Sequence, residues 1–151
     1  MKILMVCLGN ICRSPLAEGI LQAKVNSRGL DIKVDSAGTG GWHVGQGPDP
    51  RAIGIANKYG IDISQQQARQ FSSTDFEDFD IIYAMDGSNL SDIVSLANSN
   101  KDIEKVQLIL NEINPEDNTP VPDPYYGDDD GFEKVYQLLD ATCEIITKKL
   151  S

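Results

Sequence analysis

A cysteine, an arginine and a serine lie close together near the N-terminus of this sequence. Five residues separate Cys7 from Arg13, and Ser14 follows directly. A thiolate can attack phosphorus, a guanidinium can hold two phosphoryl oxygens, and a hydroxyl can donate to the sulfur. The spacing alone is weak evidence for phosphate-ester chemistry, because chance would produce it in roughly a tenth of chains with this cysteine and arginine content.

The segment that carries these residues lies between a predicted strand and a predicted helix. Residues 3–6 form an apolar run, and residues 16–27 show helical spacing of apolar side chains. The first turn of a helix offers unpaired N–H groups and a positive dipole end, which bind anions and stabilise a thiolate. Gly9 allows close backbone approach, and Asn10 tolerates a left-handed turn. We therefore predict an anion-binding loop over residues 7–14. The alternative, a buried cysteine beside a surface arginine, would make the helix-entry context a coincidence.

A general acid is also needed, because an alkoxide or phenolate leaves slowly unless it is protonated. Asp123 is the best candidate. It lies between Pro122 and Pro124 at the end of a proline-rich loop, and flanking prolines stiffen the backbone. An ordinary turn aspartate is the alternative, since aspartate is common in turns.

Histidine and cysteine content limits the other kinds of site. His43 is the only histidine, and the three cysteines include no Cys-x2-Cys pair. This excludes zinc sites built on two histidines, so we expect no metal and no cofactor. We expect the loop itself, rather than a histidine, to activate Cys7, and we expect His43 to be an exposed loop residue.

Length and charge restrict the class of protein. A chain of 151 residues suits one domain, which we predict to span residues 1–151. The net charge of −10 argues against nucleic-acid binding, which needs a basic face. No apolar run of about 18 residues or signal peptide is found, so we expect no membrane association and a cytoplasmic location. An odd number of cysteines suits a reducing compartment.

Strand-like and helix-like segments alternate along the chain. They predict an α/β fold, a single three-layer domain with a four-stranded parallel sheet and helices on both faces. Strands are expected over 2–6, 32–36, 80–84 and 106–110, and helices over 16–27, 50–59, 88–97 and 131–150, with a helical turn at 72–76. We expect Ser14 to cap the first helix. Cys7 follows the first strand, and ligands bind at the carboxyl ends of parallel strands.

Seven short motifs then occur in order over the whole chain. They are Cys7 to Pro15, Asp35 to Gly38, Trp42 to Gly45, Pro48 to Arg51, Ala68 to Gln70, Met85 to Leu90 and Asp123 to Gly127. Together they resemble the low-molecular-weight protein tyrosine phosphatases, and the resemblance runs from Lys2 to the last helix.

The resemblance implies a role for each site residue. Cys7 attacks phosphorus and becomes a phosphocysteine, Arg13 stabilises the transition state, and Asp123 protonates the leaving phenol and later activates water. The residues implied to bind phosphate or substrate are Leu8, Gly9, Asn10, Ile11, Cys12, Ser14, Trp42 and Tyr125, of which Trp42 and Tyr125 wall an aromatic ring and Leu8 lies at the rim. Asn10, Ser14 and Ser36 resemble the polar network that supports the loop.

The resemblance also suggests partners and regulation. Phosphotyrosine-containing proteins would be substrates, inorganic phosphate or similar oxyanions would occupy the site, and we expect a monomer or weak self-association. Peroxide could join Cys7 and Cys12 reversibly, although a small packing cysteine at position 12 is the alternative. Cys143 is expected in the core.

One departure concerns the segment before Ala68. Many family members carry a histidine there that is tied to the loop network, whereas this chain has Ser64 followed by three glutamines. Either a glutamine substitutes for the histidine or the network is rearranged.

Two other functions are less consistent with the sequence. A thiol-dependent arsenate reductase needs resolving cysteines on a mobile segment, and residues 81–98 contain none. A phosphotyrosine-binding module without catalysis would be expected to lack Cys7 or Asp123, and both are present.

Overall fold

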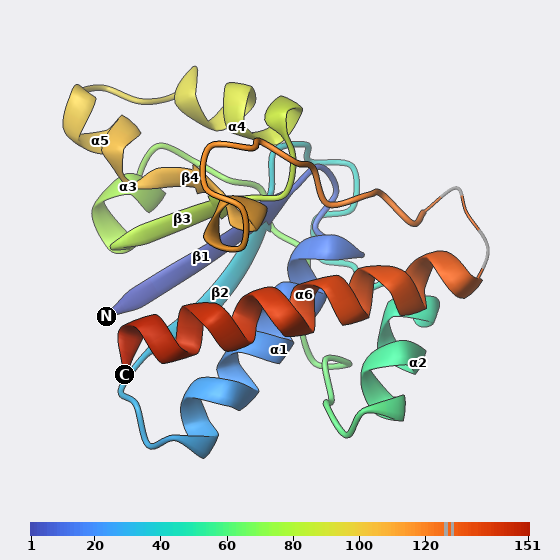
Figure 1. Ribbon diagram of the computed structural model, residues 1–151. Coiled ribbons are helices and arrows are strands. Elements are labelled where there is room, and N and C mark those ends of the chain that lie inside the picture. Colours follow the sequence, from blue (N-terminus) through green and yellow to red (C-terminus); the bar gives the residue numbers. More distant parts are fainter. Residues whose placement is uncertain (126, 128) are drawn as a thin grey trace.

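A four-stranded parallel sheet forms the middle layer of the computed structural model, which describes residues 1–125, 127 and 129–151 (Figure 1). The strands are β1 (Lys2–Cys7), β2 (Lys33–Gly38), β3 (Ile81–Ala84) and β4 (Val106–Leu108). Their order is β2-β1-β3-β4, and all three neighbouring pairs are parallel. The predicted sheet is confirmed, but β4 ends early because residues 109–112 turn into the 3-10 helix η1 (Ile109–Glu112), which buries Ile109 and Leu110.

Helices cover both faces of the sheet, which confirms the predicted three layers (Figure 1). One face carries α1 (Arg13–Ser27), α2 (Pro50–Lys58) and α6 (Asp129–Leu150), and the other carries α3 (Asp75–Asp78), α4 (Gly87–Val94) and α5 (Asn100–Glu104). The sequence did not predict α5, because it is short and its apolar residue Ile103 is exposed, so no buried stripe marks it. The turn expected at 72–76 begins later, at Asp75.

Alternation along the central strand divides the core in two. Successive side chains of a strand point to opposite faces. Ile3 and Met5 therefore pack into the cluster below α1, α2 and α6, while Leu4 and Val6 pack into the cluster that contains Phe76. All four β1 side chains are fully buried, so β1 is held rigidly from both sides.

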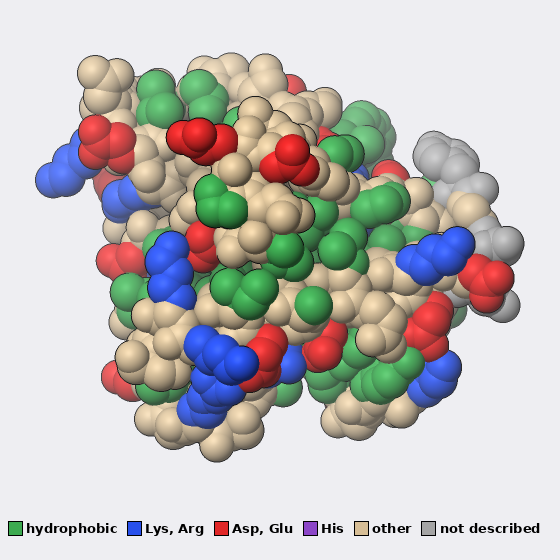
Figure 2. Space-filling model, viewed as in Figure 1, with side chains coloured by type: hydrophobic (Ala, Val, Ile, Leu, Met, Phe, Trp, Pro, Cys, Tyr) green, Lys and Arg blue, Asp and Glu red, His purple; other side chains and the backbone are tan. Residues whose placement is uncertain are grey.

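The outer surface of α1 and α6 is polar. Lys24 of α1 pairs with Asp140 and Glu144 of α6 at 3.1 Å, and Arg28 also pairs with Glu144. Figure 2 shows basic and acidic side chains interspersed over this face. Exposed pairs of this kind add little stability, typically about 0–1 kcal/mol each. None of the described helices is long and apolar enough to cross a membrane.

The strand order determines where a ligand can bind. The chain leaves β1 towards β2 on one side, and β3 lies on the other, so a topological switch point lies beside the carboxyl end of β1. A crevice forms at such a point in open parallel sheets. Cys7 is the last residue of β1, and Asp86 follows β3 closely, so both residues lie at this edge.

Candidate active site

The loop between β1 and α1 turns its carbonyl groups outward. Three of them accept hydrogen bonds at 2.8–2.9 Å from N–H groups elsewhere in the chain: Cys7 from Thr39, Leu8 from Gly40 and Ile11 from Asp49. The N–H of a trans peptide points opposite to its C=O. The N–H groups of residues 8, 9 and 12 therefore point to the inner side of the loop. Asn10 has φ 57°, the left-handed conformation that the sequence predicted.

The helix that follows starts earlier than expected. α1 begins at Arg13, and Cys12 occupies the N-cap position without a side-chain cap. The prediction that Ser14 caps the helix is wrong, because Ser14 lies inside the first turn and its hydroxyl faces Cys7 instead. Without a side-chain cap, the N–H groups of the first turn remain available for an anion.

Two polar groups contact the sulfur of Cys7. The Ser14 hydroxyl lies 3.0 Å from Sγ, and the backbone N–H of Asn10 donates to Sγ at 3.3 Å. Cys7 is 3 % exposed, so solvent contributes little to its environment. Both contacts therefore place hydrogen-bonding groups directly on the atom that would attack phosphorus.

A buried polar network holds the loop from behind. The amide nitrogen of Asn10 donates to the hydroxyls of Ser14 at 2.9 Å and Ser36 at 3.0 Å, and its oxygen accepts from the backbone N–H of Arg69 at 3.0 Å. Ser36 in turn donates to Glu18 at 2.7 Å. Glu18 could not be predicted as part of this network, because nothing in the sequence indicates which way a glutamate inside a helix faces.

The glutamine-rich segment does not join this network. Gln66 donates to the carbonyl of Pro15 at 3.1 Å, and its buried Oε1 has no hydrogen-bond partner in the described part of the chain. Of the two alternatives that the sequence left open, the contacts favour a rearranged network in which Ser36 bonds to Glu18.

Arg13 joins the loop to two other segments. It is 3 % exposed, and its Nη1 donates to Asp86 at 2.7 Å and to the carbonyl of Val121 at 3.0 Å. Its Nη2 lies 3.7 Å from the carboxylate of Asp123. Asp86 also caps α4 by accepting from the N–H of Asn89. Asp86 was not among the predicted site residues, although a helix-capping residue just after a parallel strand lies where ligands bind.

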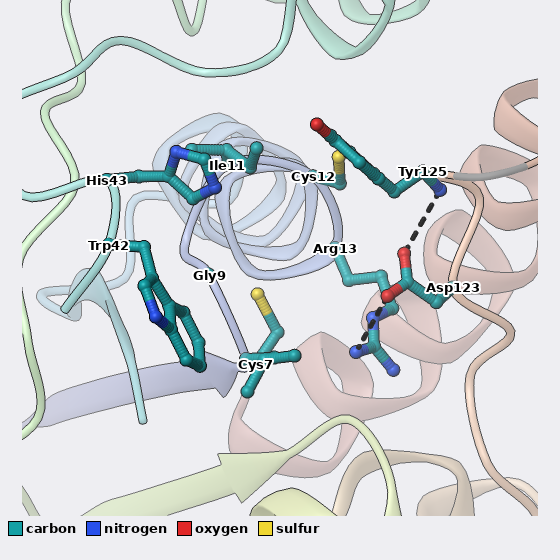
Figure 3. Close-up of a pocket in the computed structure, with 10 residues that line it drawn as sticks. Cys7, Gly9, Ile11, Cys12, Arg13, Trp42, His43, Asp123 and Tyr125 are labelled. Atoms are coloured by element: carbon teal, nitrogen blue, oxygen red, sulfur yellow. Dashed lines mark hydrogen bonds and ion pairs between the residues drawn. The ribbon is translucent and has the colours of Figure 1, made fainter. Parts of the chain in front are cut away.

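These elements enclose a pocket of about 290 Å³. It brings together ten residues: Cys7, Leu8, Gly9, Ile11, Cys12, Arg13, Trp42, His43, Asp123 and Tyr125. Figure 3 shows Trp42 on one side and Asp123 with Tyr125 on the other, with the Cys7 side chain between them. Of the other predicted site residues, Asn10, Ser14 and Ser36 do not line the pocket, and their side chains are joined by hydrogen bonds.

The pocket mouth is apolar. Trp42 is 70 % exposed, Leu8 42 % and Tyr125 39 %. Large exposed apolar side chains around a pocket mark a surface that binds a partner group. Tyr126, the other tyrosine of this motif, lies outside the described residues.

His43 differs from its expected placement. It is half-buried and lines the pocket, where a Cβ built on Gly9 would lie 3.1 Å from its ring. Its Nδ1 lies 2.9 Å from the amide oxygen of Gln46. The prediction of an exposed loop residue is therefore wrong, because the loop folds back over Gly9.

None of the three cysteines forms a disulfide. Cys12 lines the same pocket as Cys7, and burial, with a smaller effect of Asp49, raises the pKa of its thiol to about 12. Cys12 is therefore a neutral thiol near neutral pH. Cys143 is fully buried in the core, as expected.

Comparison with known proteins establishes the family. Residues 2–151 match the family model described as low molecular weight phosphotyrosine protein phosphatase. The chain belongs to this phosphatase family. The low molecular weight phosphotyrosine protein phosphatase of Schizosaccharomyces pombe is 45 % identical over 143 residues, which cover 92 % of this chain and 90 % of that one.

Solved structures show the same fold. The protein tyrosine phosphatase of Entamoeba histolytica, with Hepes in its active site, has a TM-score of 0.92 and 36 % identity, covering 99 % of this chain and 96 % of that one. Vibrio vulnificus Wzb in complex with benzylphosphonate has a TM-score of 0.87 and 30 % identity, covering 98 % and 97 %.

Gly38 supports the loop of this phosphatase by being small. A Cβ at this position would lie 2.8 Å from the carbonyl oxygen of Leu8 and 3.0 Å from the N–H of Asn10, which are backbone atoms of the loop. Gly38→Ala should therefore displace the loop and lower kcat/KM for p-nitrophenyl phosphate by about 10-fold or more. Gly54→Ala is the matched control, because a Cβ there meets nothing within 4 Å. This variant should keep full activity, and its free energy of unfolding should rise by about 0.5–1 kcal/mol, because alanine is more stable than glycine inside helix α2. Equal activity in both variants would contradict this role of Gly38.

Glu18 should make folding stability depend on pH. Burial raises the pKa of its carboxyl to about 7. Between roughly pH 4.5 and 7 the folded state keeps a proton that the unfolded state has lost, so stability falls as pH rises through this range. Relative to that of Glu18→Gln, the free energy of unfolding of the native chain should fall by on the order of 2 kcal/mol between pH 4.5 and 8. Urea unfolding of both proteins at several pH values measures this, and a constant difference would contradict it.

Proposed function

We propose that this chain hydrolyses phosphotyrosine and other aryl phosphate monoesters through a phosphocysteine on Cys7, with Asp123 as general acid and base. The observation that carries the proposal is the convergence of a buried sulfur, a buried guanidinium and a carboxylate on one pocket. Phosphotyrosine-containing proteins are the proposed substrates, and inorganic phosphate or similar oxyanions are the proposed small ligands.

Binding would depend on the loop N–H groups and Arg13. Inward N–H groups and the N-terminus of α1 attract the phosphoryl oxygens, and the planar guanidinium can hold two of them. Asp86 fixes the guanidinium through the 2.7 Å contact with Nη1. This local attraction is needed because the chain as a whole carries a net charge of −10.

The first chemical step transfers the phosphoryl group to the enzyme. The Cys7 thiolate forms a bond to phosphorus while the bond to the phenolic oxygen breaks. Protonated Asp123 donates its proton to that oxygen, so a neutral phenol leaves. Arg13 and the N–H groups stabilise the charge on the equatorial oxygens.

The second step regenerates the enzyme. The Asp123 carboxylate takes a proton from water, the resulting nucleophile attacks phosphorus, and the bond from sulfur to phosphorus breaks. The products are inorganic phosphate and the Cys7 thiolate, which accepts hydrogen bonds from Ser14 and Asn10. A carboxyl that first gives and then takes a proton is ready for the next cycle.

Selection for aromatic esters would come from the pocket walls. Trp42 and Tyr125 offer apolar faces on either side of Cys7. Contact between two aromatic rings stabilises a complex by about 0.5–1.5 kcal/mol in addition to the contribution of the apolar area that it buries. The benzylphosphonate bound to Vibrio vulnificus Wzb, a ring joined to a phosphonate, supports a ligand of this shape.

Cys7→Ser tests the nucleophile. A serine hydroxyl stays protonated near neutral pH, so turnover of p-nitrophenyl phosphate should fall by about 10⁴-fold or more, while circular dichroism and phosphate binding persist. Cys143→Ala, which removes a thiol in the core, is the control and should retain activity. Substantial turnover by the serine variant would exclude this mechanism.

Asp123→Asn tests the acid. Loss of the proton donor should lower kcat/KM for phenyl phosphate by about 100-fold or more, and by about 10-fold or less for p-nitrophenyl phosphate, whose leaving group needs less protonation. Asp117→Asn, in the same loop but outside the pocket, should change neither value. Equal losses for both substrates in the Asp123 variant would argue against an acid role.

A further inference from the structure

Arg51, near the start of α2, contacts the segment that carries Asp123. Its Nη2 donates to the carbonyl of Tyr125 at 3.0 Å, and its Nη1 lies 3.4 Å from the carbonyl of Gly127. These carbonyls belong to the residues two and four positions after Asp123. Arg51 therefore holds the chain on the downstream side of the proposed acid.

The same guanidinium is held on its other side by Asp49. Nε donates to Oδ1 at 3.1 Å and Nη2 to Oδ2 at 3.0 Å, a bidentate pair whose carboxylate is 9 % exposed. Hydrogen bonds from Arg51 lower the pKa of Asp49, so the pair is ionised. The backbone N–H of Asp49 donates to the carbonyl of Ile11 at 2.8 Å. Contacts therefore run without a break from the phosphate-binding loop to the segment that carries Asp123.

Two aromatic rings lie close to the guanidinium of Arg51. Its carbon lies 4.7 Å from the ring centre of Phe132 and 5.6 Å from that of Tyr125. Phe132 is 2 % exposed and belongs to α6, so it is a rigid support. A planar fork that stacks on a ring and donates in several directions is particular to arginine, since lysine offers a single point charge.

Arg51 does not line the substrate pocket. Upstream of Asp123, the chain is fixed by the bond from the N–H of Val121 to the carbonyl of Met85 at 2.8 Å and by Arg13. The Asp123 side chain is itself 39 % exposed, so its position depends on how the backbone is anchored on both sides.

We infer that Arg51, held by Asp49, is a positioning residue that fixes the proposed acid Asp123 relative to the phosphate-binding loop. This inference rests on the proposed function, because it assigns Arg51 an effect only through proton transfer by Asp123. A displacement of about 1 Å in a catalytic group can lower a rate by about 100-fold, so a side chain outside the pocket can matter this much.

Arg51→Met keeps an apolar stem against the rings and removes every hydrogen bond of the guanidinium. It should lower kcat/KM for phenyl phosphate by about 10-fold or more and for p-nitrophenyl phosphate by about 3-fold or less, because only the poor leaving group depends strongly on the acid. The inhibition constant of inorganic phosphate should stay within about 2-fold, since the loop N–H groups and Arg13 are intact. The kcat/KM values of Arg51→Lys should lie between those of Arg51→Met and those of the native protein.

The same substitution in an Asp123→Asn background decides whether Arg51 acts through the acid. There, Arg51→Met should change kcat/KM for either substrate by less than about 2-fold, because the effects of substitutions at residues that act as a unit are not additive. Arg28→Met, which removes an arginine–carboxylate pair at the far end of α1, is the matched control and should leave all values unchanged.

The outcomes separate this inference from the proposed function. Equal losses for both substrates, weakened phosphate inhibition, or full additivity with Asp123→Asn would overturn the role of Arg51 while leaving the acid role of Asp123 intact. Failure of Asp123→Asn alone to discriminate between leaving groups would overturn the proposed function itself. If Arg51→Met does not fold, Arg51→Lys in both backgrounds provides the same comparison.

Discussion

The loop between β1 and α1 turns its carbonyl groups outward, where they accept hydrogen bonds from other parts of the chain. The rest of the site depends on this constraint. Peptide geometry then turns the N–H groups of residues 8, 9 and 12 to the inner side of the loop. This orientation is what the proposed binding of a phosphoryl group requires. The carbonyl partners come from residues 39, 40 and 49, so the loop shape is imposed by other parts of the chain.

The buried polar network behind the loop serves the same purpose. Asn10 uses both ends of its amide, bonding to two hydroxyls and to a backbone N–H, and Glu18 completes the set through Ser36. Satisfied networks of this kind rigidify a site, whereas a missing member leaves a buried polar group unpaired. Burial raises the pKa of the Glu18 carboxyl, so the charge of this member of the network depends on pH.

The proposed acid reaches the pocket from a segment more than a hundred residues away in sequence, and its placement needs anchors. Arg13 bonds to Val121 before Asp123, and Arg51 bonds to Tyr125 after it. Each arginine is held by a carboxylate that also caps a helix, Asp86 for α4 and Asp49 for α2. These two arginine–aspartate pairs thus connect the starts of two helices to the segment that carries the proposed acid.

Much of the fold and site could be predicted from the sequence, since each feature concerned has a local cause. The apolar run at residues 3–6 predicts the buried strand β1. Asn10 is a residue type that tolerates the left-handed turn. A tryptophan among glycines, at position 42, indicates a pocket wall. Short α5 has no apolar stripe, so it could not be predicted.

The partners of Glu18, Asp86, His43 and Arg51 became known only from the folded chain. The fold also selected a contact with Cys7, and not helix capping, for the Ser14 hydroxyl. These depend on contacts between residues far apart in the chain, and no sequence spacing encodes such contacts. The sequence specifies which chemical groups are present and which local conformations they can adopt. Packing decided which of them meet, because burial and hydrogen bonding select one arrangement among many that the same residues allow.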